Sequence, residues 1–299
     1  MSHRNEMKTE MFVYYLETLL FRTLLRMINL FSLAATRRIG RTLGLLNFHI
    51  VKVRCAVVKR QLEEAFPELS EKEIHKLIRE INISSGYTAV EFCWFSPRKV
   101  ESFEKFIYIT GSEYLKEALS QKRGCIIFSG HFGNWELAAQ LIGYLSGNIY
   151  AVAKKQKNPY FNSLINDLRE SNNVYLIPKK GALRGIIDAL KANRSILMLG
   201  DQNAGKTGVP ANFFGIPAQT NPGTAKIALR FDVPIIFSVC HRLRNGKFHL
   251  RLEKSIIPKA QNSVDEAVCY YTQFFTKRLE QWVRKYPEQW FWFHRRWKV

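Results

Sequence analysis

Residues 125–136 read CIIFSGHFGNWE and contain the two patterns that decide the fold class. Residues 125–130 are mostly apolar, which is typical of a strand covered on both faces of a sheet. A turn with Gly130 and His131 follows, and a helical pattern then continues to about residue 146. A buried strand followed at once by a helix is the repeating unit of α/β proteins.

The same alternation extends along the chain and predicts an α/β fold. Its sheet is mixed and largely parallel, with helices on both sides. The loop 201–220 is rich in Gly and Pro, and Asn221-Pro222 after it is a helix start. We expect strands at 106–110, 125–130, 148–153, 174–178, 195–200, 233–239 and 248–253, and helices at 112–122, 158–172, 181–193 and 263–286.

The first hundred residues predict helices. Ser70-Glu71-Lys72-Glu73 has the form of a capping box and predicts a helix from there to about Phe95, with Pro97 after its end. We expect this part to pack on the α/β core. We divide the chain into an N-terminal helix, 1–36, and a main domain, 37–299, with a helical lead-in at 37–104 and an α/β core at 105–299.

Residues 11–35, MFVYYLETLLFRTLLRMINLFSLAA, form the most apolar long stretch. As one helix they would measure roughly 37 Å, enough to cross a hydrocarbon core. Glu17, Arg22 and Arg26 interrupt the stretch, and Arg22 and Arg26 share a polar stripe with Thr18 and Asn29. This pattern favours a helix lying in a membrane interface, with a buried core helix as the alternative. No cleavage site of a secretory signal follows it.

Charge is the most extreme global property of the chain. Its 45 Lys and Arg against 25 Asp and Glu give a net charge of +20. Such an excess favours a polyanionic partner: nucleic acid, an anionic membrane, a phosphorylated lipid or an acidic carrier protein. Residues 37–60 carry seven Lys and Arg and no acid, which supports a cytoplasmic membrane face or, equally, a solvated helix face.

Five cysteines lie far apart, without a C-x-x-C pair. This pattern supports neither a disulfide framework nor a zinc ribbon, and it fits a reducing compartment.

His131 and Glu136 carry the clearest chemical signal, because catalytic groups gather where parallel strands end. Five residues along one helix turn the two side chains roughly 140° apart. They can therefore meet only if His131 lies in the turn and Glu136 in the first helical turn. A carboxylate there would orient the imidazole as a base. The alternative is a histidine that caps the helix or packs in the core.

Other catalytic patterns are absent from the sequence. G-x-G-x-x-G does not occur at this turn, and neither H-E-x-x-H nor G-x-S-x-G is present. A histidine base without a nucleophilic side chain suits direct attack by an acceptor hydroxyl on a bound electrophile.

Gly130 to Glu136 and a series of later segments resemble, in chain order, the late acyltransferases of lipid A biosynthesis. These are the lauroyl and myristoyl transferases of the lysophospholipid acyltransferase superfamily. Gly130 to Glu136 is similar to their H-x-x-x-x-[DE] motif. The further matching segments, in chain order, are Leu168-Arg169, Ile177 to Gly181, Gly200-Asp201-Gln202-Asn203, Phe213-Phe214-Gly215, Ala218-x-Thr220, Pro287 to Trp290 and Trp292 to Lys298.

The resemblance implies a glycerolipid-acyltransferase-like fold and an enzyme of lipopolysaccharide biosynthesis on the cytoplasmic face of the bacterial inner membrane. It would move a fatty acyl chain from acyl carrier protein to a hydroxyl of a lipid A precursor, a phosphorylated glycolipid. No metal and no organic cofactor would be needed, and no nucleic acid would bind. Other glycolipid or lysophospholipid acceptors, and coenzyme A as carrier, stay open.

By position in the motif, the resemblance makes His131 the base and Glu136 its partner. Arg169, Asp201 and Asn134 become substrate-binding or oxyanion groups, and we expect either a backbone N–H near 132–134 or Arg169 to stabilise the oxyanion. We expect a loop at 213–216 to border an apolar groove that measures the acyl chain.

Two rivals from other classes stay open: a non-catalytic membrane scaffold of the same fold and a basic nucleic-acid-binding protein. The C-terminal WFWFHRRWKV has the mixture of aromatic and basic residues found in RNA platforms. The same mixture also occurs at membrane interfaces and in helix packing.

Overall fold

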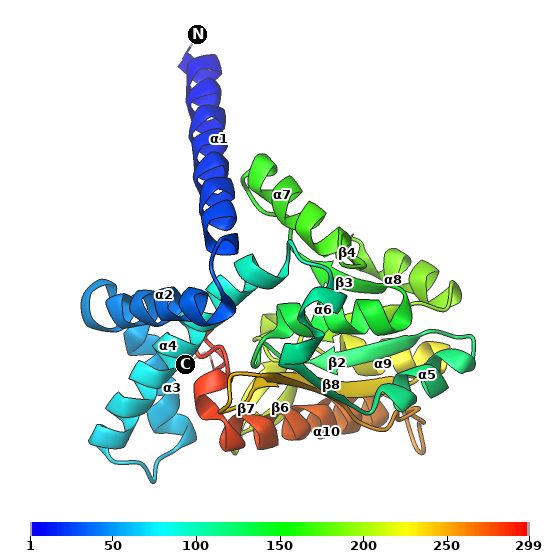
Figure 1. The fold of residues 1–299 in the computed structure, drawn as a ribbon. Helices are drawn as coiled ribbons and strands as arrows, with labels where there is room; N and C mark the ends of the chain where they lie inside the picture. The colour runs from blue at the N-terminus through cyan, green and yellow to red at the C-terminus, as the bar shows by residue number, and fades with distance from the viewer. Residues whose placement is uncertain (1, 298–299) are drawn as a thin grey trace.

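A seven-stranded sheet forms the centre of the computed structural model, which describes residues 2–297 and side chains from residue 9 (Figure 1). The strand order is β1-β9-β8-β2-β5-β3-β4. All seven predicted strands are confirmed, with ends shifted by at most three residues. They are β1 (Ile107–Thr110), β2 (Cys125–Ser129), β3 (Ile149–Ala153), β4 (Val174–Pro178), β5 (Ser195–Leu199), β8 (Ile235–Arg242) and β9 (Phe248–Leu252).

Strand direction confirms the mixed, largely parallel sheet. β8, β2, β5, β3 and β4 run parallel to their neighbours. Only β9 is antiparallel to β8, and β1 is parallel to β9 at the edge. The parallel strands therefore all end at the same edge of the sheet, where the turn after β2 lies.

Helices cover both faces of the sheet, because alternate strand residues point to opposite sides. Ile126 and Phe128 pack in the cluster that contains α8 (Ala182–Lys191), α9 (Gly223–Phe231) and α10 (Val264–Lys285). Cys125 and Ile127 pack on the other face. That face is covered by α5 (Ser112–Ser120), α6 (Trp135–Ser146), α7 (Pro159–Glu170) and the end of α4.

The stretch 201–220, which the sequence predicts as a loop, contains a hairpin. β6 (Val209–Phe213) pairs antiparallel with β7 (Ile216–Thr220). The two-residue turn Phe214-Gly215 has positive φ at both positions, as a type I′ turn requires. Phe214 is an unusual residue for this conformation, and the prolines within both strands also weaken the strand pattern.

The first hundred residues are helical, as predicted. The helices are α1 (Ser2–Asn29), α2 (Leu33–Leu46), the π-helix η1 (Asn47–Val51), α3 (Cys55–Ala65) and α4 (Glu71–Phe95), with the 3₁₀ helix η2 (Val100–Phe106) before β1. The capping box is confirmed at the start of α4, where Ser70 and Glu73 cap each other.

The prediction of one helix over residues 11–35 is wrong. α1 ends at Asn29, and Ser32 begins α2 by accepting a hydrogen bond from the backbone N–H of Ala35 at 3.3 Å. A serine N-cap three residues after the helix end provides the competing start signal. α1 extends away from the rest of the chain (Figure 1). Among residues 2–297, no helix combines the length and apolar character needed to cross a membrane.

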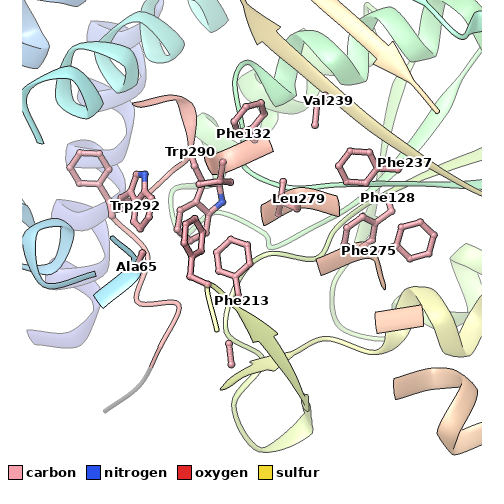
Figure 2. Close-up of a cluster of buried hydrophobic side chains, with 14 of the residues drawn as sticks. Ala65, Phe128, Phe132, Phe213, Phe237, Val239, Phe275, Leu279, Trp290 and Trp292 are labelled. Atoms are coloured by element: carbon pink, nitrogen blue, oxygen red, sulfur yellow. The ribbon is translucent and has the colours of Figure 1, made fainter. Parts of the chain in front are cut away.

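The C-terminal segment packs inside the molecule. Trp290 and Trp292 lie beside Phe213 of the hairpin, with Ala65 of α3 on one side and Phe132 on the other (Figure 2). Trp290, Trp292, Trp297 and Arg296 are all buried. The helical first third and the α/β core therefore share one hydrophobic cluster, closed by the aromatic C-terminal segment.

The backbones of α2 and α4 approach each other so closely that only glycine fits at the points of contact. A Cβ on Gly86 would lie 2.1 Å from the carbonyl oxygen of Gly40, and a Cβ on Gly44 would lie 2.4 Å from that of Asn82. Because these obstacles are backbone atoms, a side chain could be accommodated only by moving a helix.

We expect Gly86→Ala to destabilise the protein by about 1–3 kcal/mol, the cost of overpacking a close contact. In an unobstructed helix the same change would stabilise by about 1 kcal/mol, so the sign of the effect is diagnostic. The midpoint of chemical unfolding measures it. Ser85→Ala, at the preceding position of α4, is the control and should change the midpoint little.

Candidate active site

His131 and Asp201 lie next to each other because of strand register. β2 and β5 are parallel neighbours, and Ser129 is paired with Leu199. Two residues beyond this pair, the chains reach His131 and Asp201, just past the ends of both strands. The sheet thus brings together two side chains that are 70 residues apart in the sequence.

The Asp201 carboxylate accepts three hydrogen bonds. Oδ1 lies 2.8 Å from Nδ1 of His131, and Oδ2 accepts from the backbone N–H of His131 at 2.8 Å. Oδ2 also accepts from the indole N–H of Trp290 at 2.8 Å. With Nδ1–H donating to Asp201, Nε2 carries the lone pair. No protein group in the described part of the chain hydrogen-bonds Nε2, so this nitrogen can accept a substrate proton.

Electrostatics favour the charged forms of Asp201 and His131. Burial opposes the charge of Asp201, but the charge of His131 and the hydrogen bonds from His131 and Trp290 lower the pKa of Asp201 to about 2. Burial likewise opposes protonation of His131. The charge and hydrogen bond of Asp201, together with the charge of Glu136, outweigh burial and raise the pKa of His131. A raised pKa makes Nε2 a stronger base.

Glu136 does not orient His131, contrary to the prediction. Its carboxylate, in the first turn of α6, accepts two hydrogen bonds from Arg169 in the last turn of α7, at 3.0 Å from Nε and 2.7 Å from Nη2. Asp201 takes the place on the imidazole that the sequence analysis gave to Glu136. The two expected residues Glu136 and Arg169 form one partly exposed ion pair, and within the described residues no protein group hydrogen-bonds Nη1 of Arg169.

The expected backbone oxyanion donors are already engaged. The N–H of Phe132 donates to the carbonyl of Gly130, that of Gly133 to Gln289 and that of Asn134 to Cys240, each at 2.8 Å. The prediction of an oxyanion hole at 132–134 is therefore wrong for this arrangement. Arg169 keeps a free guanidinium nitrogen.

Asn134 is a structural residue here. Its Oδ1 accepts from the backbone N–H of Leu137 at 2.9 Å and caps α6, and its Nδ2 donates to Glu91 at 3.1 Å. The side chain is buried, and both of its polar atoms are bonded within the protein.

Glu91 is a site residue that the sequence analysis missed. It is fully buried on α4 and accepts hydrogen bonds from Arg37, Arg242 and Asn134. Thr88, one turn earlier, donates to the carbonyl of Gly133 at 3.3 Å. α4 therefore fixes the turn that carries His131. A glutamate inside an otherwise apolar helical run was the available signal.

An apolar groove of about 480 Å³ adjoins the histidine. The His131 ring packs against Trp135 and Phe291, with centroids 5.2 and 6.3 Å away, and both aromatic residues line the groove. The walls come from α1, α2, α4 and α7, and Glu136 and Arg169 lie among them. The loop 213–216 does not line it, contrary to expectation. Phe213 and Phe214 pack in the core instead.

Comparison with known proteins identifies the family of the chain. The model of the bacterial lipid A biosynthesis acyltransferases matches residues 4–299. The chain belongs to this family. The lipid A biosynthesis lauroyltransferase of Escherichia coli K12 is 29% identical over 266 residues, covering 88% of this chain and 85% of the relative. The palmitoleoyltransferase of the same strain is 27% identical over 268 residues, covering 87% and 84%.

A more distant relative is named for a different glycolipid. The phosphatidylinositol mannoside acyltransferase of Mycobacterium tuberculosis (strain CDC 1551 / Oshkosh) is 25% identical over 186 residues, covering 61% of this chain and 57% of the relative. Family membership confirms the resemblance seen in the sequence, and the chain is an O-acyltransferase of this family.

Asp201→Asn should lower the pKa of His131, because it removes the negative charge that raises it. If His131 must be neutral to act as base, the acidic limb of the kcat/KM profile should move to lower pH. The plateau rate should fall by about 100-fold or more, since the amide stabilises the imidazolium less. The pH–rate profile measures both effects. An acidic limb that stays in place in the variant would contradict the pairing.

Proposed function

We propose that this protein transfers a fatty acyl chain from the thioester of acyl carrier protein to a hydroxyl of a lipid A precursor, with His131 as general base. The observation that carries the proposal is the His131–Asp201 pair at the edge of an apolar groove. A buried carboxylate behind an imidazole is the base-and-orienter arrangement of acyl transfer, and here no serine or cysteine in a nucleophile-elbow motif accompanies it.

The reaction then proceeds by direct attack. Nε2 of His131 takes the proton of the acceptor hydroxyl while its oxygen adds to the thioester carbonyl. The tetrahedral intermediate collapses by breaking the carbon–sulfur bond. The imidazolium returns the proton to the leaving thiolate, so the products are an ester and a free thiol. Asp201 stays ionised throughout and stabilises the imidazolium.

Arg169 is the best-placed cation for the negative charge that develops on the carbonyl oxygen. Arg169 lines the groove, and Glu136 holds its Nε and Nη2, which leaves Nη1 without a protein partner among the described residues. A pre-oriented charged donor stabilises an oxyanion without reorganisation. Glu136 would then be a positioning residue that acts through Arg169.

The groove fits the apolar part of the substrates. Its walls include Phe21, Ile28, Phe161 and Ile165. The net charge of +20 favours an acidic carrier protein and a phosphorylated acceptor. The rival of a nucleic-acid-binding protein loses one of its two supports, because the aromatic residues within the described part of the C-terminal segment, 290–297, are buried or half-buried and are not available for base stacking.

His131→Ala should lower turnover by at least about 100-fold, the scale of general-base catalysis. The assay offers detergent-dispersed lipid A precursor and lysophospholipid as acceptors, with a panel of acyl carrier protein and coenzyme A thioesters as donors. Mass spectrometry identifies the lipid product. His75→Ala, which changes an exposed histidine of α4, is the control. Near-normal transfer by folded His131→Ala would eliminate the proposed base, and an acylated lysophospholipid in place of lipid A would identify a different acceptor.

We further propose that α1, the end of α2 and the adjoining η1 segment attach the protein to the cytoplasmic face of the inner membrane. Phe12, Leu20 and Leu30 are 61%, 73% and 84% exposed. The exposed apolar residues of this surface are Met11, Phe12, Val13, Tyr15, Leu16, Leu19, Leu20, Leu24, Met27, Leu30, Phe31, Leu43, Leu46, Ile50, Val51 and Val53. So many exposed apolar side chains in one part of the chain mark an interaction site, and a helix lying in the interface would bury them.

Leu20→Glu/Leu30→Glu should release a large part of the protein from membranes, because two charges would enter the apolar interface. Membrane flotation with liposomes of bacterial lipids measures it. Leu183→Glu, which changes an exposed leucine of α8, is the matched control. Wild-type protein should stay bound at high salt, which screens only the basic residues. Complete release of wild-type protein by salt alone would contradict apolar attachment.

A further inference from the structure

A second, basic cavity adjoins the apolar groove. Its volume is about 990 Å³, and it is formed by α2, α4, the turn between β8 and β9, the end of α10 and the 3₁₀ helix η4 (Pro287–Gln289). Two carboxylates, Glu80 and Glu288, line it. Its five cationic residues are Arg41, Arg79, Arg242, Arg244 and Lys285. The lining therefore has more than twice as many cations as anions.

The cations of this basic cavity lack carboxylate partners, with one exception. Within the described side chains, Arg41, Arg79, Arg244 and Lys285 form no ion pair. Arg242 is paired with Glu91 at 2.6 Å, but Glu91 also pairs with Arg37 at 2.7 Å. Two guanidinium groups, whose side chains are only 10% and 15% exposed, thus share one carboxylate and leave an excess positive charge. Burying such an excess is costly unless an anion offsets it.

The basic cavity borders the apolar groove beside the active site. Ser84, Glu288 and Gln289 line both the cavity and the apolar groove. The Gln289 side chain bonds the backbone of Arg242 in both directions, at 2.8 and 2.9 Å, and its carbonyl accepts from Gly133 two residues after His131. One amphiphilic molecule can therefore place an anionic group among the arginines and an apolar part along the groove.

We propose that the basic cavity binds a phosphate group of the lipid acceptor, and so positions the acceptor hydroxyl at His131. Arginine binds phosphate in two-pronged, charge-assisted geometry, and three of these arginines are unpaired. The proposal deepens the proposed function and rests on it for the identity of the acceptor.

The location of Arg41 favours the acceptor over the donor as the source of the phosphate. Arg41 lies on α2, close in sequence to Leu43 and Leu46, which belong to the exposed apolar surface proposed to face the membrane. A lipid headgroup at the membrane surface reaches this cavity directly. The phosphate of a carrier protein's pantetheine arm would approach from the aqueous side.

The test removes the three unpaired arginines together, in Arg41→Gln/Arg79→Gln/Arg244→Gln. Transfer is measured in detergent micelles, so that membrane attachment does not affect the result, with a phosphorylated lipid A precursor and with the same lipid after phosphatase treatment. We expect KM for the phosphorylated acceptor to rise by about 100-fold or more, at roughly tenfold per arginine. KM for the dephosphorylated lipid, KM for the donor and kcat should change little. The control Arg184→Gln/Lys191→Gln/Lys226→Gln removes the same charge from α8 and α9.

A rise in KM that is equal for both acceptors would overturn the proposal, and so would a rise confined to the donor. Direct binding separates this result from the proposed function. In ³¹P NMR titrations, glucose 1-phosphate should bind the wild-type protein and the charge-matched control and should bind the triple variant much more weakly. Equal binding to wild type and triple variant would refute the phosphate site even if transfer is normal. Selective loss of binding would support the site even if the transfer assay fails.

Discussion

The carboxylate of Asp201 is the constraint on which the site depends. It is buried, and it accepts hydrogen bonds from the ring and backbone of His131 and from the indole of Trp290. These partners come from two distant parts of the chain, the turn after β2 and the C-terminal segment. A buried carboxylate must be fully hydrogen-bonded to stay ionised, so each segment is fixed relative to the others. The histidine is held in one tautomer by the same bonds that close the fold.

Glu91 has the same function on the other side of the turn. It connects α2, α4, the end of β8 and the N-cap of α6 through Arg37, Arg242 and Asn134. The helical first third is therefore more than a lead-in to the α/β core. It fixes Gly133 and Asn134, supplies walls of the apolar groove and forms part of the basic cavity.

Much of the fold was predictable from sequence, because hydrophobic periodicity encodes each strand and helix locally. The order of the strands is not encoded in this way, and the active site depends on it. His131 and Asp201 were both visible as polar residues after strands, but only the adjacency of β2 and β5 pairs them. Glu136 is nearer to His131 in the sequence, and the local pattern therefore indicated it as the partner of His131. In the structure Glu136 pairs with Arg169, which lies on a helix whose position is set by tertiary packing. The burial of the aromatic C-terminal segment likewise depends on the hairpin and α3, which local patterns do not place beside it.

The pairing of His131 with Asp201 also ties stability to activity. The pKa of Asp201 falls from an ordinary value of 3.8 to about 2 on folding, so its ionised form contributes stability above pH 3.8 that is lost as pH falls towards 2. The pKa of His131 rises from 6.5 on folding, so its contribution is complete below pH 6.5 and is lost as pH rises through the higher folded value. The pair therefore stabilises the fold most at mildly acidic pH, where the imidazole is protonated and cannot act as a base. When the imidazole of His131 is neutral, as catalysis requires, the fold lacks part of this stability.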